Sequence, residues 1–344
     1  MSQKLRGLIL VALYLALPLC LSPYAFGQET FYESKTMRII VAAAPGGGYD
    51  TYSRLIARHM GRHIPGNPRF IVENMPGGGQ LIAANHVYKI AKPDGLTMGH
   101  FTGNLVINQV FDQPGVEFDM RRLEYIGAPT ADHTACAFTR ASGITSTDRW
   151  LASKKPVKMG GIGPGNIIDN ALRVLKFATH FPIQVVSGYK GTALIRLALE
   201  AGELEGSCWG WDSIRATWGK AVQSGEGIVV VQVSAKPHPE LSKVPLAINF
   251  GKHEEGRQFI DVVVHGGNFI ERSYVFPPGT PKDRVEIVRQ AFAKTMEDPE
   301  FLAEAKKSKL GIAPIPGEEL KRSIQAFFQL PKELRAKLKE ILFN

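Results

Sequence analysis

The stretch VAAAPGGGYDTYSRLIARHM, residues 41–60, decides how the fold of this chain is interpreted. It continues an apolar run over residues 37–43, which is typical of a strand buried on both faces of a parallel sheet. Gly46, Gly47 and Gly48 then form a turn, and apolar residues at helical spacing follow them. The order strand, glycine loop, helix predicts an α/β unit whose loop lies at the carboxyl end of a sheet, where ligands bind.

The same order recurs along the chain. Short apolar runs predict further strands at residues 69–73, 96–100, 124–127, 134–138, 157–160, 183–186, 205–208 and 227–233. Amphipathic stretches predict helices, among them residues 80–91, 166–178, 192–201, 282–296 and 316–328. Strands that alternate with helices indicate parallel sheets. We therefore expect two doubly wound α/β lobes, with residues 28–130 plus 235–344 in lobe 1 and residues 131–234 inserted as lobe 2.

The N-terminus indicates export. Lys4 and Arg6 precede an apolar run over residues 8–21, and small residues follow at a cleavage position. This pattern predicts a signal peptide at residues 1–27 and a periplasmic mature protein. A membrane anchor is the alternative, and a lipid-modified Cys20 is a second one.

Composition excludes several classes of protein. The chain has 344 residues, 44% hydrophobic and 21% charged, which fits a globular protein and not a disordered one. Its 41 Lys and Arg exceed its 32 Asp and Glu by nine, but the cations are scattered. Because binding to nucleic acid requires clustered cations, we expect no nucleic-acid partner.

Two cysteines remain after the expected signal peptide. Cys136 and Cys208 each lie in a predicted strand, so they either pair as a disulfide or stay as buried thiols, and the second reading is slightly favoured. Neither has the spacing of a metal or redox site. We expect no metal.

A second glycine loop supports a binding function. Gly161, Gly163 and Gly165 precede Asn166 at the start of a predicted helix. Glycine lets the backbone approach a ligand, and the first turn of a helix offers unpaired amides to an anion. Neither this loop nor the first has Walker or dinucleotide-binding spacing, so no cofactor is expected. The two loops predict a carboxylate site in which each lobe provides one wall.

Four segments carry a resemblance to a known family. They read VAAAPGGGYDTYSRLIARHM (41–60), FIVENMPGGGQLIAANHVYKIAKPDGLTMGHF (70–101), GGIGPGNIIDNALRVL (160–175) and VVSGYKGTALIRLALEAGELEGSCW (185–209). In order and spacing the chain resembles the periplasmic solute receptors of tripartite tricarboxylate transporters, the Bug family. The resemblance implies a type II periplasmic-binding-protein fold, a hinged Venus flytrap that holds a small organic acid through loop backbone and ordered water.

The resemblance also implies the receptor's partners. The ligand would be a di-, tri- or aromatic carboxylate, and the receptor, expected to be a monomer, would deliver it to membrane permease subunits without catalysis. Tyr49 and Asp50 correspond to the family's ligand loop, and Thr102 and Asn104 to a segment near the ligand. From its position alone, Asp50 is equally well explained as a helix cap.

Further candidates lie in lobe 2. Tyr189 and Lys190 follow a predicted strand, although Lys190 fits a solvated position equally well. Trp209 and Trp211 are two residues apart in what we expect to be a strand, so both would face one side, either the core or an aromatic ligand. Asp212 follows them in the same segment and is a further candidate.

Two other functions stay open. A solute sensor that signals to a partner would have the same fold. An exported hydrolase would need a nucleophile and a base, and Ser187 with His180 or His133 is the one tolerable pair. Neither a GxSxG nor an HExxH motif is present, and His133 is more simply explained as a structural residue.

Overall fold

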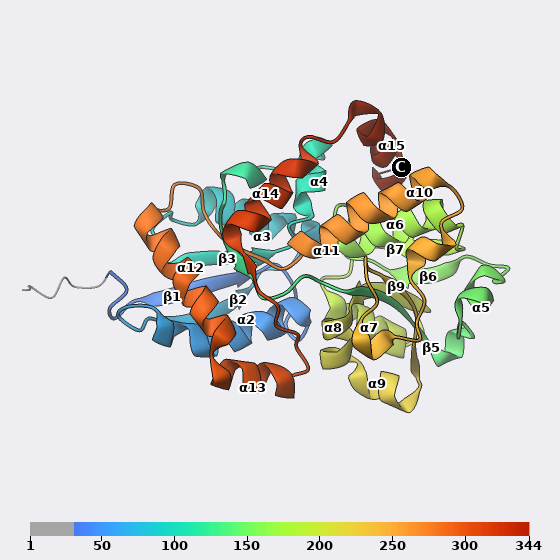
Figure 1. Cartoon of the computed structure of the whole chain (residues 1–344), viewed down its shortest axis with the longest axis horizontal. Helices are drawn as coiled ribbons and strands as arrows, with labels where there is room; N and C mark the ends of the chain where they lie inside the picture. The colour runs from blue at the N-terminus through green and yellow to red at the C-terminus, as the bar shows by residue number, and fades with distance from the viewer. Residues whose placement is uncertain (1–30, 344) are drawn as a thin grey trace, which may run out of the picture.

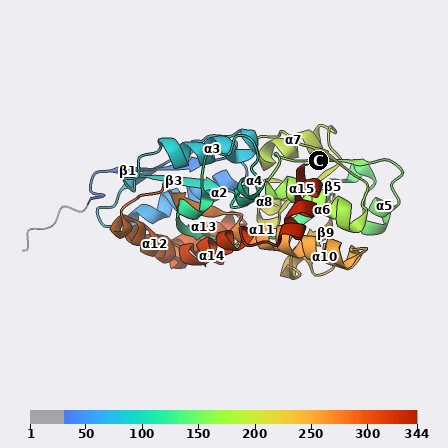
Figure 2. The ribbon, with the colours of Figure 1, turned by 90° about the horizontal axis from the view of Figure 1, so that it is seen from above.

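The computed structural model describes residues 31–343 and shows two α/β lobes that lie end to end along the long axis (Figures 1 and 2). Each lobe is built on its own sheet. The expected fold class is therefore confirmed. The expected signal peptide lies outside the described residues. No helix within the described part of the chain is long and apolar enough to cross a membrane.

The first sheet has six strands in the order β11-β4-β10-β3-β1-β2. Its strands are β1 (Thr36–Val41), β2 (Arg69–Asn74), β3 (Thr97–Phe101), β4 (Glu124–Ala128), β10 (Ser273–Phe276) and β11 (Ile315–Pro316). Strand β1 pairs in parallel with β2 and β3. Strand β10 is antiparallel to both β3 and β4, so the sheet is mixed.

The second sheet has five strands in the order β7-β6-β8-β5-β9. Its strands are β5 (Thr134–Thr139), β6 (Val157–Gly160), β7 (Ile183–Val186), β8 (Gly206–Gly210) and β9 (Gly227–Val233). Strand β6 is parallel to β7 and β8, whereas β5 is antiparallel to β8 and β9. The chain enters the second lobe just before β5 and is back in the first sheet at β10. These two strands run antiparallel to their neighbours in their own sheets.

Helices follow most of the strands. They are α2 (Gly48–His59), α3 (Leu81–Asn85), α4 (Leu105–Val110), α5 (Thr147–Leu151), α6 (Ile167–Thr179), α7 (Thr192–Glu200), α8 (Trp211–Thr217), α9 (Gly219–Ser224), α10 (Glu254–Phe259), α11 (Gly266–Ile270), α12 (Lys282–Glu297), α13 (Pro299–Lys307), α14 (Gly317–Phe327) and α15 (Lys332–Phe343). Helix α6 ends at His180, which adopts a left-handed φ of 60°.

Three local expectations differ from the structure. Strands β10 and β11 were not predicted, because each is short and β10 lies just before a proline pair. The helix expected at 80–91 is broken into α3 and a π-helical turn, η3 (His86–Ile90). Trp211 begins α8, because β8 ends at Gly210.

The C-terminal third contacts both lobes. Helix α14 packs on β4 of the first sheet, whereas α10, the π-helical segment η8 (Ile260–His265) and α15 pack on α6 of the second lobe. Phe343 at the end of α15 also makes an edge contact with Phe111, which follows α4 in the first lobe. The segment 235–343 therefore contacts both lobes.

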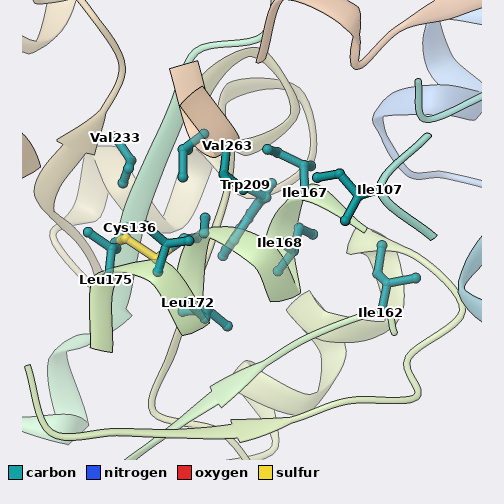
Figure 3. Close-up of a cluster of buried hydrophobic side chains, with 14 of the residues drawn as sticks. Ile107, Cys136, Ile162, Ile167, Ile168, Leu172, Leu175, Trp209, Val233 and Val263 are labelled. Atoms are coloured by element: carbon teal, nitrogen blue, oxygen red, sulfur yellow. A yellow bond between two sulfur atoms is a disulfide. The ribbon is translucent and has the colours of Figure 1, made fainter. Parts of the chain in front are cut away.

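The second sheet is cross-linked through its centre. Cys136 in β5 lies directly opposite Cys208 in β8, and the two form a disulfide. Of the two alternatives in the sequence, the structure thus has the bonded pair. The disulfide lies among buried apolar side chains of α6, with Trp209 beside it (Figure 3).

Candidate functional site

The loop after β1 meets the start of α7 in the other lobe. The Ala44 amide donates a hydrogen bond of 2.8 Å to the Lys190 carbonyl, and the Gly48 amide approaches Thr192 Oγ1 at 3.4 Å. A Cβ at Gly47 would lie only 2.9 Å from Thr192 Oγ1. The first glycine loop therefore allows the two lobes to approach closely, and Gly47 faces the β7–α7 loop.

A second contact joins another pair of loops. A Cβ at Gly163 would lie 2.9 Å from the Cα atom of Gly79, in the loop after β2. Beside it, Asn108 Nδ2 in α4 donates to the Pro164 carbonyl at 3.1 Å. Gly165, with φ +83°, has no room for a Cβ beside the same asparagine. Gly163 and Gly165 thus lie where the lobes touch, Gly163 against the glycine loop at 77–79 and Gly165 against Asn108 of α4.

The amides of the second loop already have an anion. Asp169, the third residue of α6, accepts hydrogen bonds from the amides of Ile162 at 2.7 Å and Gly163 at 2.8 Å. The other oxygen of Asp169 accepts a hydrogen bond from the Ser187 hydroxyl. The Asp169 carboxylate also leaves no space for a Cβ at Gly161. These amides, expected to face a ligand, instead bind the chain's own carboxylate.

The first loop has a similar arrangement. Asp50, the third residue of α2, accepts from the Gly46 amide at 2.9 Å, from Asn74 Nδ2 at 2.9 Å and from Arg54. Burial raises the pKa of Asp50, but the hydrogen bonds from Arg54, Gly46 and Asn74 outweigh it, and the net shift is downward. This geometry favours the reading of Asp50 as a residue that orders the helix start.

Other candidates in lobe 2 hold the loops in shape. Asn166 caps α6, because its side chain accepts from the Ile168 amide at 3.0 Å. The Tyr189 amide donates to the Gly161 carbonyl at 3.2 Å, and its ring is half-buried. The Lys190 side chain is exposed at the rim.

Tyr49, Thr102 and Asn104 converge on a buried carboxyl group that the sequence did not reveal. Glu271, 3% exposed, accepts from the Tyr49 hydroxyl and the Thr102 hydroxyl, and from Asn104 Nδ2 at 2.9 Å. Burial, followed by the charge of Asp132, raises the pKa of Glu271 to about 7, although the hydrogen bonds from Thr102 and Tyr49 and the charge of Arg272 oppose the shift. The three predicted residues are thus brought together, with their polar atoms turned to Glu271.

Side-chain amides from both lobes lie beside the Glu271 contacts and the contacts of the 161–165 loop, and each keeps one polar atom without a hydrogen-bond partner. Five of these side chains each have one buried oxygen or nitrogen with no partner within residues 31–343: Gln80, Asn104, Asn108, Asn166 and Asn170. Gln80 Oε1 accepts from the Thr102 amide, and Asn170 Nδ2 donates to the Gly165 carbonyl, which places both beside the contacts described above. Buried polar atoms in proteins nearly always have partners, so this cluster marks a place for a ligand or water.

The amide cluster can serve both ends of a polar ligand. The hydrogen bonds on the other atom of each amide decide what stays free. Gln80 and Asn166 have a free nitrogen that can donate to a carboxylate, whereas Asn104, Asn108 and Asn170 have a free oxygen that can accept from a hydroxyl. The sequence identified Asn104 and Asn166 and missed Gln80, Asn108 and Asn170. Gln80 directly follows the glycine run 77–79, which was a usable signal.

The tryptophan pair does not form an aromatic platform. Trp209 is 1% exposed and packs near Trp218 in the lobe 2 core, with ring centroids 5.9 Å apart (Figure 3). Trp211 lies in α8 and donates through its indole nitrogen to Glu240 at 2.8 Å. Asp212 accepts from the Tyr52 hydroxyl at 2.8 Å and so links α8 to the first lobe. The expectation of two rings on one strand face is wrong, because the strand ends between them.

Sequence comparison gives a partial relative. No protein-family model matches the chain. Over 73 residues it is 38% identical to the "UPF0065 protein in the TAR-I ttuE-ttuC' intergenic region" of Agrobacterium vitis. The match covers 21% of this chain and 20% of that protein, so the chain spans about a fifth of the relative's length.

Solved structures match over 90% of the chain. MatC from Rhodopseudomonas palustris with bound malate has a TM-score of 0.68 at 18% identity, and 99% of that chain is covered. The periplasmic binding protein BugD has 0.69 at 18%, with 97% covered. Rpa4515 of R. palustris with adipate has 0.68 at 18%, again with 97% covered. This chain has the fold of a periplasmic solute receptor. The fold implied by the resemblance to the Bug family is thereby confirmed, and the amide cluster lies between the two lobes of that receptor fold.

Proposed function

We propose that this protein is a periplasmic solute receptor of the Bug family that captures a small carboxylate between its lobes. The observation that carries the proposal is the set of buried, unpartnered side-chain amides contributed by both lobes where their glycine loops touch. A ligand held there would contact both lobes at once. Its binding would therefore favour the closed arrangement, as a receptor that moves by a hinge requires.

The ligand is a dicarboxylate or hydroxydicarboxylate. Free amide nitrogens suit carboxylate oxygens, and free amide oxygens suit hydroxyl groups or water. Neighbours of the same fold hold malate and adipate, which both have two carboxylates, and malate also has a hydroxyl group. An aromatic acid is less well supported, because Trp209 is in the core and Trp211 points its indole nitrogen at Glu240.

The receptor works without catalysis and delivers its ligand to permease subunits of a tripartite tricarboxylate-type transporter. The pair required for a hydrolase is not supported by the contacts. Ser187 donates to Asp169, and the His133 ring bonds Gln232 and Ser234. We propose that the two sheets mark the two moving lobes, with residues 131–234 as the inserted one and the mature protein acting as a monomer.

A ligand panel tests the proposal. The mature protein is screened by thermal denaturation with malate, succinate, adipate, citrate and benzoate, and by mass spectrometry for acids retained on purification. At ligand concentrations 100-fold above Kd, binding stabilises the native state by about 2.7 kcal/mol. A rise in the midpoint with a diacid supports the receptor. The absence of any shift across the panel contradicts it.

A single methyl group tests where the ligand binds. In Gly163→Ala the new Cβ would meet the Cα of Gly79 at 2.9 Å, so the lobes cannot close fully and diacid affinity should fall about 10-fold, or about 1.4 kcal/mol. Gly266→Ala is the matched control, because its Cβ would meet the nearest atom at an ordinary 3.7 Å. Equal affinities of both variants and wild type, measured by calorimetry, would exclude this contact from the site.

A further inference from the structure

A buried arginine lies where the two lobes and the chain between them meet. Arg272 directly precedes β10 and is 1% exposed. Its Nη2 donates to Asp132 Oδ1 at 3.0 Å and to Ser213 Oγ at 3.1 Å. Asp132 lies in the segment that passes from β4 to β5, and Ser213 lies in α8 of the second lobe. The guanidinium group is thus fixed from both sides of the lobe junction.

Most of this guanidinium group has no acceptor. Both Nε and Nη1 of Arg272 are buried and lack a hydrogen-bond partner among residues 31–343. A buried donor without an acceptor costs about 1–3 kcal/mol, and more when it is charged. The site therefore has hydrogen-bonding capacity that the folded chain does not use.

The free donors face a second positive feature. A Cβ at Gly48 would lie 3.3 Å from Arg272 Nη1, so this nitrogen adjoins the first turn of α2, a helix of 12 residues. The N-terminal end of such a helix carries partial positive charge and attracts anions. The rings of Tyr52 and Tyr49 flank the guanidinium carbon at 4.7 and 5.8 Å. The positive helix end and the cation thus converge on one place.

Arg272 stays positively charged in this environment, whereas the nearby His100 is neutral. Burial lowers the pKa of Arg272, but the charge of Asp132 and the nearby tyrosines raise it above the ordinary value. Burial, and then the charge of Arg272, hold the pKa of His100 well below its usual value, so His100 is neutral. Asp132 balances the charge of Arg272, and Asp50 is turned to Arg54. Glu271 bonds Tyr49 in the first turn of α2, and burial keeps the pKa of Glu271 raised overall, although the charge of Arg272 lowers it.

We propose that Arg272 is a specificity-determining residue that forms an ion pair with one carboxylate of the ligand through Nη1. This inference rests on the proposed receptor function and extends it. Nη1 carries N–H donors on a charged group, so it can form a charge-assisted hydrogen bond with a carboxylate oxygen. Tyr49 and Asn104 both bond Glu271, which connects this position to the amide cluster. The ligand is a diacid whose second polar end reaches that cluster.

The test compares acids that differ by one carboxylate. Calorimetry gives Kd for adipate against hexanoate and for succinate against butanoate. In the wild type each diacid binds at least about 30-fold more tightly than its monoacid, as expected when a buried charge pair is lost. In Asp132→Asn/Arg272→Gln, which removes both charges of this ion pair, that ratio falls to within about threefold of one.

Two further variants keep the test decisive. Arg272→Lys retains the charge but moves the donor away from the position of Nη1, so it gives an intermediate ratio even if the double variant does not fold. Arg289→Gln is the control, because Arg289 is a half-buried arginine of the same lobe that pairs with Glu318 and lies away from the loops. It keeps the wild-type ratio.

The outcomes separate this inference from the receptor function. A wild type that binds diacids, with the same preference in the Arg272 variants, overturns the role of Arg272 and leaves the receptor intact. Variants that weaken diacid and monoacid equally indicate a structural role and also overturn it. A wild type that binds none of the four acids overturns both.

Discussion

The two glycine loops start their helices in the same way but balance the resulting charge differently. In each, the third residue of the helix is an aspartate that bonds back to the loop: Asp50 to Gly46, and Asp169 to Ile162 and Gly163. Asp50 also has Arg54 as a partially exposed counter-ion. Asp169 is fully buried and, among its described contacts, is held by amides and the Ser187 hydroxyl alone.

This difference shows what the glycines do. In the second lobe the amides of Ile162 and Gly163 are occupied by Asp169, and Gly163 and Gly165 lie where the lobes approach closely. An incoming carboxylate must find its donors elsewhere. The free donors are on the side-chain amides and, as proposed, on Arg272.

The largest expected effect concerns the sheet that underlies the second loop. Cys136→Ala/Cys208→Ala removes a cross-link between residues 72 apart, which should lower the free energy of unfolding by about 4 kcal/mol. Hydrogen exchange should show a greater loss of protection in the second sheet than in the first, which has no cysteine in its strands. An equal loss in both sheets would mean that the lobes unfold as one unit.

The two aspartates should differ in the next largest effect. Asp169→Ala leaves two buried amides and the Ser187 hydroxyl without a partner, so we expect a loss of about 3 kcal/mol in unfolding free energy. Asp50→Ala should cost about 1 kcal/mol, because the Gly46 loop position and Arg54 can turn to water.

Denaturant titration measures both values. Asp148→Ala is the control, because Asp148 is exposed in the first turn of α5 in the second lobe. If Asp50→Ala proved as harmful as Asp169→Ala, the contrast between a solvated and a buried anion would be wrong.

The smallest expected effect is the response of the first loop to acid. The pKa of Asp50 in the folded protein is lowered from its ordinary value of 3.8. Asp50 therefore stabilises the fold above about that pH, and this contribution is lost as pH falls through the lowered folded-state pKa. Thermal midpoints recorded from about pH 5 to pH 3 should fall less in Asp50→Asn than in the wild type. Parallel curves would show that Asp50 does not contribute.

Much of the fold followed from the sequence, because its elements are local. Continuous apolar strands such as β1 and capped helices such as α6 were predicted close to their observed bounds. Strand β10 was not, since its four residues join β3 and β4 by pairing across more than a hundred residues of chain. The pattern of apolar residues within one segment does not show which distant strands that segment pairs with.

The candidate site was predictable in part for the same reason. Glycine loops are recognisable motifs in a sequence, so Gly47 and Gly163 were predicted to lie between the lobes, and both are found there. Glu271 and Arg272 have no motif around them and become partners of Tyr49 and Asp132 through tertiary folding alone. Trp211 was misplaced because the boundary of β8 fell one residue before it.

Helix α15 contacts both lobes. It lies against α6 of one lobe, while Phe343 touches Phe111 of the other. Separation of the lobes would remove α15 from one of its two neighbours and expose side chains such as Leu338 and Leu342 to water. The burial of each such side chain stabilises the fold by about 1.5–3 kcal/mol. The packing of this twelve-residue helix on both lobes therefore opposes their separation.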